Sequence, residues 1–118
     1  MNYEIWDLAN AGYPNQEDHS KTTDRPVIII DDLGDEFTLC PLTKQVHQAS
    51  RYQYTILIEK DSDEGIEMGL GYSSLIVLDR LCDFRKFLLR GKPKRCPDSI
   101  IKKIEEILQK MKDNGEYR

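Results

Sequence analysis

Five short segments of the chain have the hydrophobic pattern of β-strands. Each combines β-branched or aromatic residues with Gly, Pro, Asn or Asp at its ends, which is typical of strands bounded by turns. These segments are residues 3–8, 27–31, 37–40, 52–59 and 74–79. Residues 10–24 are mostly polar and include Gly12 and Pro14, so they are predicted to form a long loop between the first two strands.

The pattern changes to a helical period after Pro97. Apolar residues then recur at spacings of three and four, which places them on one helix face; they are Ile100, Ile101, Ile104, Ile107, Leu108 and Met111. Such a stripe needs a surface to cover, and a sheet of short strands has open edges that need cover. The two patterns together predict a mainly β (α+β) fold, a small bent sheet with one C-terminal amphipathic helix.

Length and composition fit a single domain over residues 1–118. Hydrophobic residues make up 39% of the chain and charged residues 32%, which is too apolar for a disordered protein. The longest apolar runs, residues 27–30 and 75–78, are far shorter than the about 20 residues of a membrane span. The first residues lack the basic and apolar stretches of a secretion signal, so we expect a cytoplasmic protein without a membrane segment.

The cysteines and histidines do not have the spacing of a disulfide framework or a metal site. Cys40, Cys82 and Cys96 are odd in number and widely separated, which fits a reducing compartment. His19 and His47 have no cysteine at ligand spacing, so a metal site would need scattered residues. We therefore expect neither a metal ion nor another cofactor.

Charge is distributed unevenly along the chain. The formal net charge is −4, which is not the balance of a typical nucleic-acid-binding protein. Residues 80–97, however, carry seven basic side chains and one acidic side chain, a net charge of +6. This basic segment can hold a polyanion despite the acidic total. A solvated charged loop is the alternative interpretation of the same residues.

Several short landmarks follow one another in the sequence. In order they are YEIWDL, Asp24-Arg25-Pro26 before an apolar run, Cys40-Pro41-Leu42-Thr43, and SLIVLDR from Ser74 to Arg80. In this order and spacing the chain resembles the MazF/PemK (Kid-like) family of ribonuclease toxins, from Tyr3 to about Met111. The resemblance implies an SH3-like, CcdB-type β-barrel of about five strands with a C-terminal helix.

The chain also departs from the family pattern. Tyr3 stands in place of a glycine, residues 19–24 differ from the usual approach to the Arg-Pro pair, Lys44-Gln45 replaces a serine, and Arg80 replaces a glutamine. The changes in the first loop fall on residues that would contact a substrate.

The resemblance implies a specific chemistry. Family members cleave single-stranded RNA without a metal, with the ribose 2′-hydroxyl as nucleophile. The reaction needs a base for the 2′ proton, an acid for the 5′ leaving oxygen and donors to the phosphoryl group. By the resemblance, Arg25 binds the phosphate, Thr43 donates a hydrogen bond and Ser74 orients the phosphate. Asp79 is the implied base and His19 the implied proton donor.

Other residues are candidates for RNA binding. The basic candidates are Lys21, Lys44, Arg80, Arg85, Lys86 and Lys94. Tyr13, Tyr52, Tyr54 and Tyr72 offer rings for an unpaired base, with packing the expected use of the strand pair Tyr52 and Tyr54. Each candidate also has a plainer interpretation, such as a surface arginine before proline, a threonine that ends a strand or a solvated histidine.

The resemblance also indicates partners. We expect a homodimer whose groove holds single-stranded RNA, together with a cognate antitoxin. The alternative is a non-catalytic binding module on the same barrel, as in related toxins that bind DNA gyrase, or a degenerate member that serves only as an antitoxin partner. Retention of Arg25, Thr43, Ser74 and Asp79 in register favours a sequence-selective endoribonuclease, the toxin of a toxin-antitoxin pair.

Overall fold

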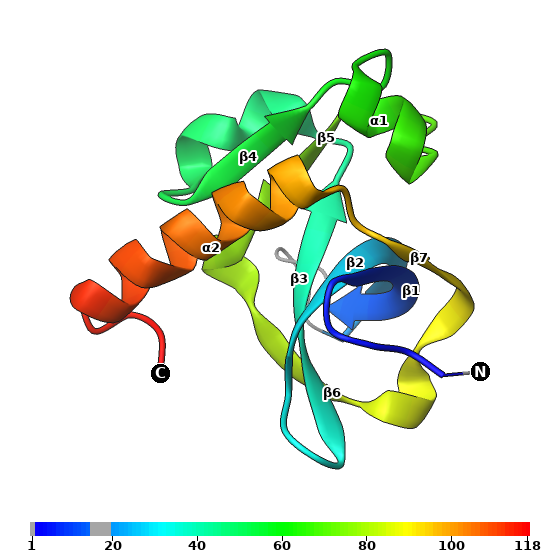
Figure 1. The fold of residues 1–118 in the computed structure, drawn as a ribbon, viewed down its shortest axis with the longest axis vertical. Coiled ribbons are helices and arrows are strands. Elements are labelled where there is room, and N and C mark those ends of the chain that lie inside the picture. The colour runs from blue at the N-terminus through cyan, green and yellow to red at the C-terminus, as the bar shows by residue number, and fades with distance from the viewer. Residues whose placement is uncertain (1, 15–19) are drawn as a thin grey trace.

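A computed structural model describes residues 2–14 and 20–118 of the chain (Figure 1). Its strands are β1 (Asp7–Pro14), β2 (Thr22–Asp32), β3 (Glu36–Thr43), β4 (Thr55–Ile58), β5 (Ser74–Val77), β6 (Cys82–Arg85) and β7 (Arg90–Arg95). The α-helices are α1 (Asp63–Met68) and α2 (Asp98–Asp113), and the 3₁₀ helices are η1 (Val46–Arg51), η2 (Leu78–Arg80) and η3 (Lys86–Leu88).

All seven strands of the described chain belong to one antiparallel sheet. Their order is β4-β5-β3-β2-β1-β7, and β6 pairs with β3 off this path. Strand β2 pairs with β3 from Phe37 to Pro41, and β3 also pairs with β6 at its beginning and with β5 at its end. Strands β4 and β7 end the path and do not pair with each other within the described residues, so the sheet stays open. The predicted mainly β, barrel-like fold with a C-terminal helix is confirmed.

Strand β2 carries buried residues on both faces. Ile28 and Ile30 join the core cluster beneath α2, whereas Val27 and Ile29 join a second cluster with β1. A continuous apolar run therefore replaces the polar-apolar alternation of a half-exposed strand. Burial of each such side chain contributes about 1.5–3 kcal/mol relative to leaving it in water.

Helix α2 lies across the sheet and covers the first of these clusters (Figure 1). The residues that it buries belong to the predicted apolar stripe, namely Ile100, Ile101, Ile104, Leu108 and Met111. The sequence prediction of this helix is confirmed. No helix in residues 2–14 and 20–118 is long and apolar enough to cross a membrane.

The largest differences between the sheet and the sequence prediction lie at β1 and in the basic segment. Strand β1 begins at Asp7 and continues to Pro14, so it occupies part of the stretch for which the sequence predicts a loop. Strands β6 and β7 form within the basic segment, which is therefore not a loop throughout. Few of their side chains are buried, so they are held mainly by their backbone hydrogen bonds to β3 and β1. The sheet has seven strands instead of about five.

Candidate functional site

A cavity of about 480 Å³ opens between the start of β2, the end of β3 and the segment before β5. Its walls combine basic, hydroxyl, amide and aromatic side chains. The residues that line it are Thr23, Asp24, Arg25, Pro26, Pro41, Leu42, Thr43, Lys44, Gln45, Gln48, Arg51, Tyr52, Leu70, Gly71, Tyr72, Ser74, Val77 and Arg80. The fold thus brings together five of the predicted site residues: Arg25, Thr43, Ser74, Lys44 and Arg80.

Arg25 is the half-buried cation of this cavity. It lies on β2 opposite Ala11 of β1, in a sheet register that continues through Pro26. Its Nε is buried without a hydrogen-bond partner in the described chain. Burial lowers the pKa of the Arg25 guanidinium, and the positive charge of Arg80 lowers it further. Because arginine stays protonated in proteins, an unpaired buried donor beside a second cation is a strong site for an anion.

Thr43 and Ser74 lie on neighbouring strands. Thr43 at the end of β3 pairs with Leu75, the residue after Ser74 in β5. The Thr43 hydroxyl oxygen accepts a hydrogen bond from the Gln45 backbone N–H at 3.2 Å, which leaves its O–H free to donate. The Ser74 O–H instead donates to the Tyr72 carbonyl at 3.0 Å. Ser74 is buried and holds the segment before β5, so its geometry favours a positioning role.

Four cations surround the cavity. Besides Arg25 they are Lys44 after β3, Arg51 at the end of η1 and Arg80 at the end of η2. Among the described lining residues, Asp24 is the one carboxylate, and its Oδ1 lies 2.7 Å from Nη2 of Arg90. The cavity therefore carries an excess of positive charge within an acidic chain, as an anion site requires.

Arg80 is tethered at both its backbone and its side chain. Its Nη2 donates to the Pro14 carbonyl at 2.7 Å, and its own carbonyl accepts from the Tyr13 hydroxyl at 2.5 Å. The guanidinium also lies 5.7 Å from the centre of the Tyr13 ring. These contacts fix one side of the guanidinium and keep its charge at the cavity wall.

Arg51 was not predicted from the sequence as a residue of the site. Nothing in its immediate sequence distinguishes it from other basic residues. It reaches the cavity because η1, which ends at Arg51, folds against the end of the sheet. Gln48 of the same helix was likewise not predicted.

The structure places Asp79 outside the cavity lining. Its Oδ1 accepts the Tyr54 N–H at 2.7 Å and its Oδ2 accepts the Gln53 N–H at 2.8 Å. The carboxylate therefore satisfies two backbone donors that precede β4. His19, the implied proton donor, lies outside the described residues.

The other basic candidates do not line this cavity in the described structure. Lys21 is exposed just before β2, Arg85 lies opposite Glu36 at the end of β6, and Lys94 lies on β7. Lys86 is held elsewhere, since its Nζ lies 2.8 Å from Asp32 and 4.5 Å from the centre of the Phe37 ring. Within the basic segment, Arg80 is the residue that the fold places at the cavity among those described.

Comparison with known proteins agrees with the resemblance noted in the sequence. The family model described as PemK-like, MazF-like toxin of type II toxin-antitoxin system matches residues 3–111. A search of curated proteins found no match. Because the family match spans nearly the whole chain, from before β1 into α2, the protein belongs to the PemK-like, MazF-like family of toxins of type II toxin-antitoxin systems.

Proposed function

We propose that this toxin is a metal-independent, sequence-selective endoribonuclease that cleaves single-stranded mRNA in the cytoplasm. The observation that carries the proposal is the cavity that is lined by Arg25, whose Nε is buried without a partner in the described chain, by Thr43 and by three further cations. Guanidinium and hydroxyl donors bind a phosphate oxygen directly. The described lining contains one carboxylate and no histidine or cysteine, so its chemistry suits a phosphate better than a metal ion.

In the proposed reaction, the 2′-oxygen of the ribose attacks the adjacent phosphorus. A bond from the 2′-oxygen to phosphorus forms, and the bond from phosphorus to the 5′-oxygen breaks. The 2′ proton passes to a base, and an acid donates a proton to the 5′-oxygen as it leaves; His19, which lies outside the described residues, stays the candidate for this acid. Arg25 and Thr43 donate to the phosphoryl oxygens as their negative charge increases. The products are a 2′,3′-cyclic phosphate and a 5′-hydroxyl.

Asp24 is our candidate acceptor for the 2′ proton, because it is the carboxylate among the described lining residues of the cavity. Its Oδ1 lies 2.7 Å from Nη2 of Arg90. Asp79 instead bonds to the amides before β4. We therefore propose Asp24 as the base, and Asp79 holds the chain before β4 through the amides of Gln53 and Tyr54.

Protein partners complete the proposal. Membership of a type II toxin family implies a cognate antitoxin. An acidic antitoxin segment laid over the cavity would compete with RNA for the cations there. We also propose a homodimer, because a chain of 118 residues offers a short surface to an extended RNA strand and two-fold pairing lengthens it.

The position of Asp79 favours a second candidate function. A domain in which this carboxylate serves the backbone retains an anion-binding cavity but lacks the base that the family resemblance implied. Such a protein would act as a non-catalytic binding module through the same surface.

One experiment separates the two functions. A long RNA is incubated with the protein in EDTA, and the cut positions and end groups are mapped. The nuclease gives 2′,3′-cyclic phosphate and 5′-hydroxyl ends, and Arg25→Ala lowers the rate about 10²-fold or more with an unchanged fold. Lys103→Ala, which removes one positive charge from an exposed position of α2, serves as the matched control. A requirement for Mg²⁺, 5′-phosphate ends or wild-type cleavage by Arg25→Ala contradicts the proposal, and binding without cleavage supports the second function.

A further inference from the structure

Tyr72 is an aromatic side chain that stays open to solvent inside the cavity. Its relative exposure is 65%. Of the large apolar or aromatic side chains that are exposed in the described chain, Tyr72 is the one that lines the cavity. An exposed aromatic ring in a basic groove is the usual stacking surface for bases of single-stranded nucleic acids, because every base has a π-face.

The contacts around Tyr72 hold it in place without covering it. Its carbonyl accepts the Ser74 hydroxyl at 3.0 Å, and the neighbouring Ser73 hydroxyl accepts the Lys60 N–H at 3.1 Å. Lys44 Nζ lies 5.0 Å from the centre of the Tyr72 ring, a cation–π contact. The residue is therefore oriented before any ligand binds, which reduces the entropy cost of binding.

Two side-chain amides lie in the same cavity. Gln45 precedes η1 and Gln48 lies within it, and both line the cavity with Tyr72. Each primary amide provides donors and an acceptor, as do the Watson–Crick edges of the bases. An aromatic face combined with polar groups at the edge is the way proteins recognise unpaired bases in RNA.

The cavity has room for this arrangement. Its volume of about 480 Å³ lies within the range of about 300–1,000 Å³ found for pockets that take small organic ligands. Arg25, Thr43 and Tyr72 line this one space, so donors for a phosphate and an aromatic face are available in the same cavity.

We propose that Tyr72 stacks on an unpaired base next to the phosphate held by Arg25, with Gln45 and Gln48 contacting the edge of that base. This inference rests on the proposed function, because it takes single-stranded RNA as the ligand. It makes Tyr72 a determinant of RNA affinity and of the cleavage sequence.

Binding of an uncleavable RNA tests the stacking directly. Short random-sequence RNA with methylated 2′-hydroxyls lacks the nucleophile, so its affinity can be measured by fluorescence anisotropy without cleavage. Tyr72→Ala should weaken binding about tenfold, the usual effect of removing one stacking ring, and Tyr72→Phe should retain the wild-type affinity. Phe87→Ala is the matched control, because Phe87 is 81% exposed and lies outside the cavity. Equal affinities of Tyr72→Ala and wild type would overturn the inference.

A cycle with abasic RNA identifies the base. Bases of one well-bound sequence are removed one at a time, and the affinity of wild type should fall most at one position. At that position the abasic substitution should have no further effect on Tyr72→Ala, because the ring and the base act as a pair. Additive effects at every position would refute the pairing.

The two proposals can fail separately. If wild type binds uncleavable RNA through Tyr72 but cuts none, the nuclease proposal fails and the stacking inference stands. If wild type cuts RNA and Tyr72→Ala keeps both its affinity and its cleavage sequence, the stacking inference fails and the nuclease proposal stands.

Discussion

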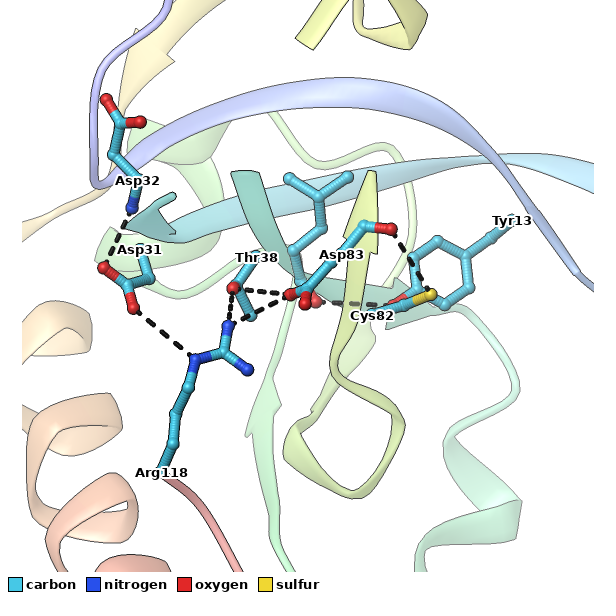
Figure 2. A network of polar contacts seen from close by, with 8 residues as sticks. Tyr13, Asp31, Asp32, Thr38, Cys82, Asp83 and Arg118 are labelled. Atoms are coloured by element: carbon cyan, nitrogen blue, oxygen red, sulfur yellow. Dashed lines mark hydrogen bonds and ion pairs between the residues drawn. The ribbon is translucent and has the colours of Figure 1, made fainter. Parts of the chain in front are cut away.

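Arg118 Nη2 donates a hydrogen bond to Asp83 Oδ1 at 3.1 Å and thereby joins the segment after α2 to strand β6 (Figure 2). The same guanidinium group donates to the Thr38 hydroxyl oxygen, and its Nε lies 3.9 Å from Asp31. Thr38 in turn donates to Asp83 at 2.7 Å. The network links β2, β3 and β6 to the chain after the helix, on residues outside the cavity lining.

The buried and exposed members of this network should contribute differently to stability. Thr38 is 1% exposed, so Thr38→Val removes a buried hydroxyl that serves two charged partners and should cost about 1–3 kcal/mol. Arg118→Ala removes a half-exposed ion pair and should cost less than about 1 kcal/mol. Urea unfolding at neutral pH measures both. A greater destabilisation by Arg118→Ala would contradict this ranking.

The stability contributed by Asp83 should depend on pH. The hydrogen bond from Thr38, and then the contacts with Arg118, lower the pKa of the Asp83 carboxyl in the folded protein, although burial partly opposes them. A lowered folded pKa stabilises the fold fully above the unfolded pKa of about 3.9, and the contribution disappears as pH falls through the folded value. Asp83→Asn should therefore be less stable than wild type at pH 7, and the difference should shrink below about pH 4. A difference that persists unchanged in acid would exclude this linkage.

The parts of the fold that were predicted correctly have strong hydrophobic periods. Helix α2 could be predicted from the spacing of its isoleucines. Strand β2 could be predicted from its run of four apolar residues, all of which are buried in the structure. The continuation of strand β1 to Pro14 was not predicted, because its buried positions are small or aromatic residues, Ala9, Ala11 and Tyr13, interrupted by Asn10 and Gly12, which favour turns. Strands β6 and β7 depend on backbone pairing, which leaves little hydrophobic signal in the sequence.

The candidate site divides in the same way. Arg25 and Thr43 could be predicted because the family resemblance concerns the chain order of strand ends, and the fold places those ends around one cavity. The position of Arg51 at the cavity depends on the packing of η1, and the bonds of Asp79 depend on where the chain before β4 passes. Neither relationship is encoded in a local sequence pattern.

The two carboxylates should separate into a chemical and a positioning role. Asp24→Asn should lower single-turnover RNA cleavage about 10²-fold or more, because it removes the carboxylate that we propose as the base. Asp79→Asn should lower stability while the rate per folded molecule changes little, because its partners are backbone amides. Arg90→Gln is the control for Asp24, since it breaks their ion pair and leaves the carboxylate. Loss of cleavage in a stably folded Asp79→Asn variant, with activity kept in Asp24→Asn, would return the base role to Asp79.

The cations that line the cavity, more than the basic residues of segment 80–97 that lie outside it, should set the salt dependence of RNA binding. Removing one cation that binds a phosphate should reduce the log-log slope of affinity against salt by about 0.7 for a single strand. A triple variant, Lys44→Gln, Arg51→Gln and Arg80→Gln, removes three positive charges from the cavity wall. The comparison variant neutralises Arg85, Lys86 and Lys94, which carry the same number of charges and lie outside the lining.

Salt titrations of uncleavable RNA with both triple variants measure this difference. The cavity variant should have the flatter slope, because the cations that it loses line the same cavity as Arg25, the proposed phosphate site where RNA would displace counterions. The comparison variant should keep more of the wild-type slope, since Lys86 already pairs with Asp32 within the fold. If the comparison variant has the flatter slope, the proposed RNA path through the cavity is wrong. The RNA would then follow β6 and β7, the path that the positive charge of the basic segment indicates.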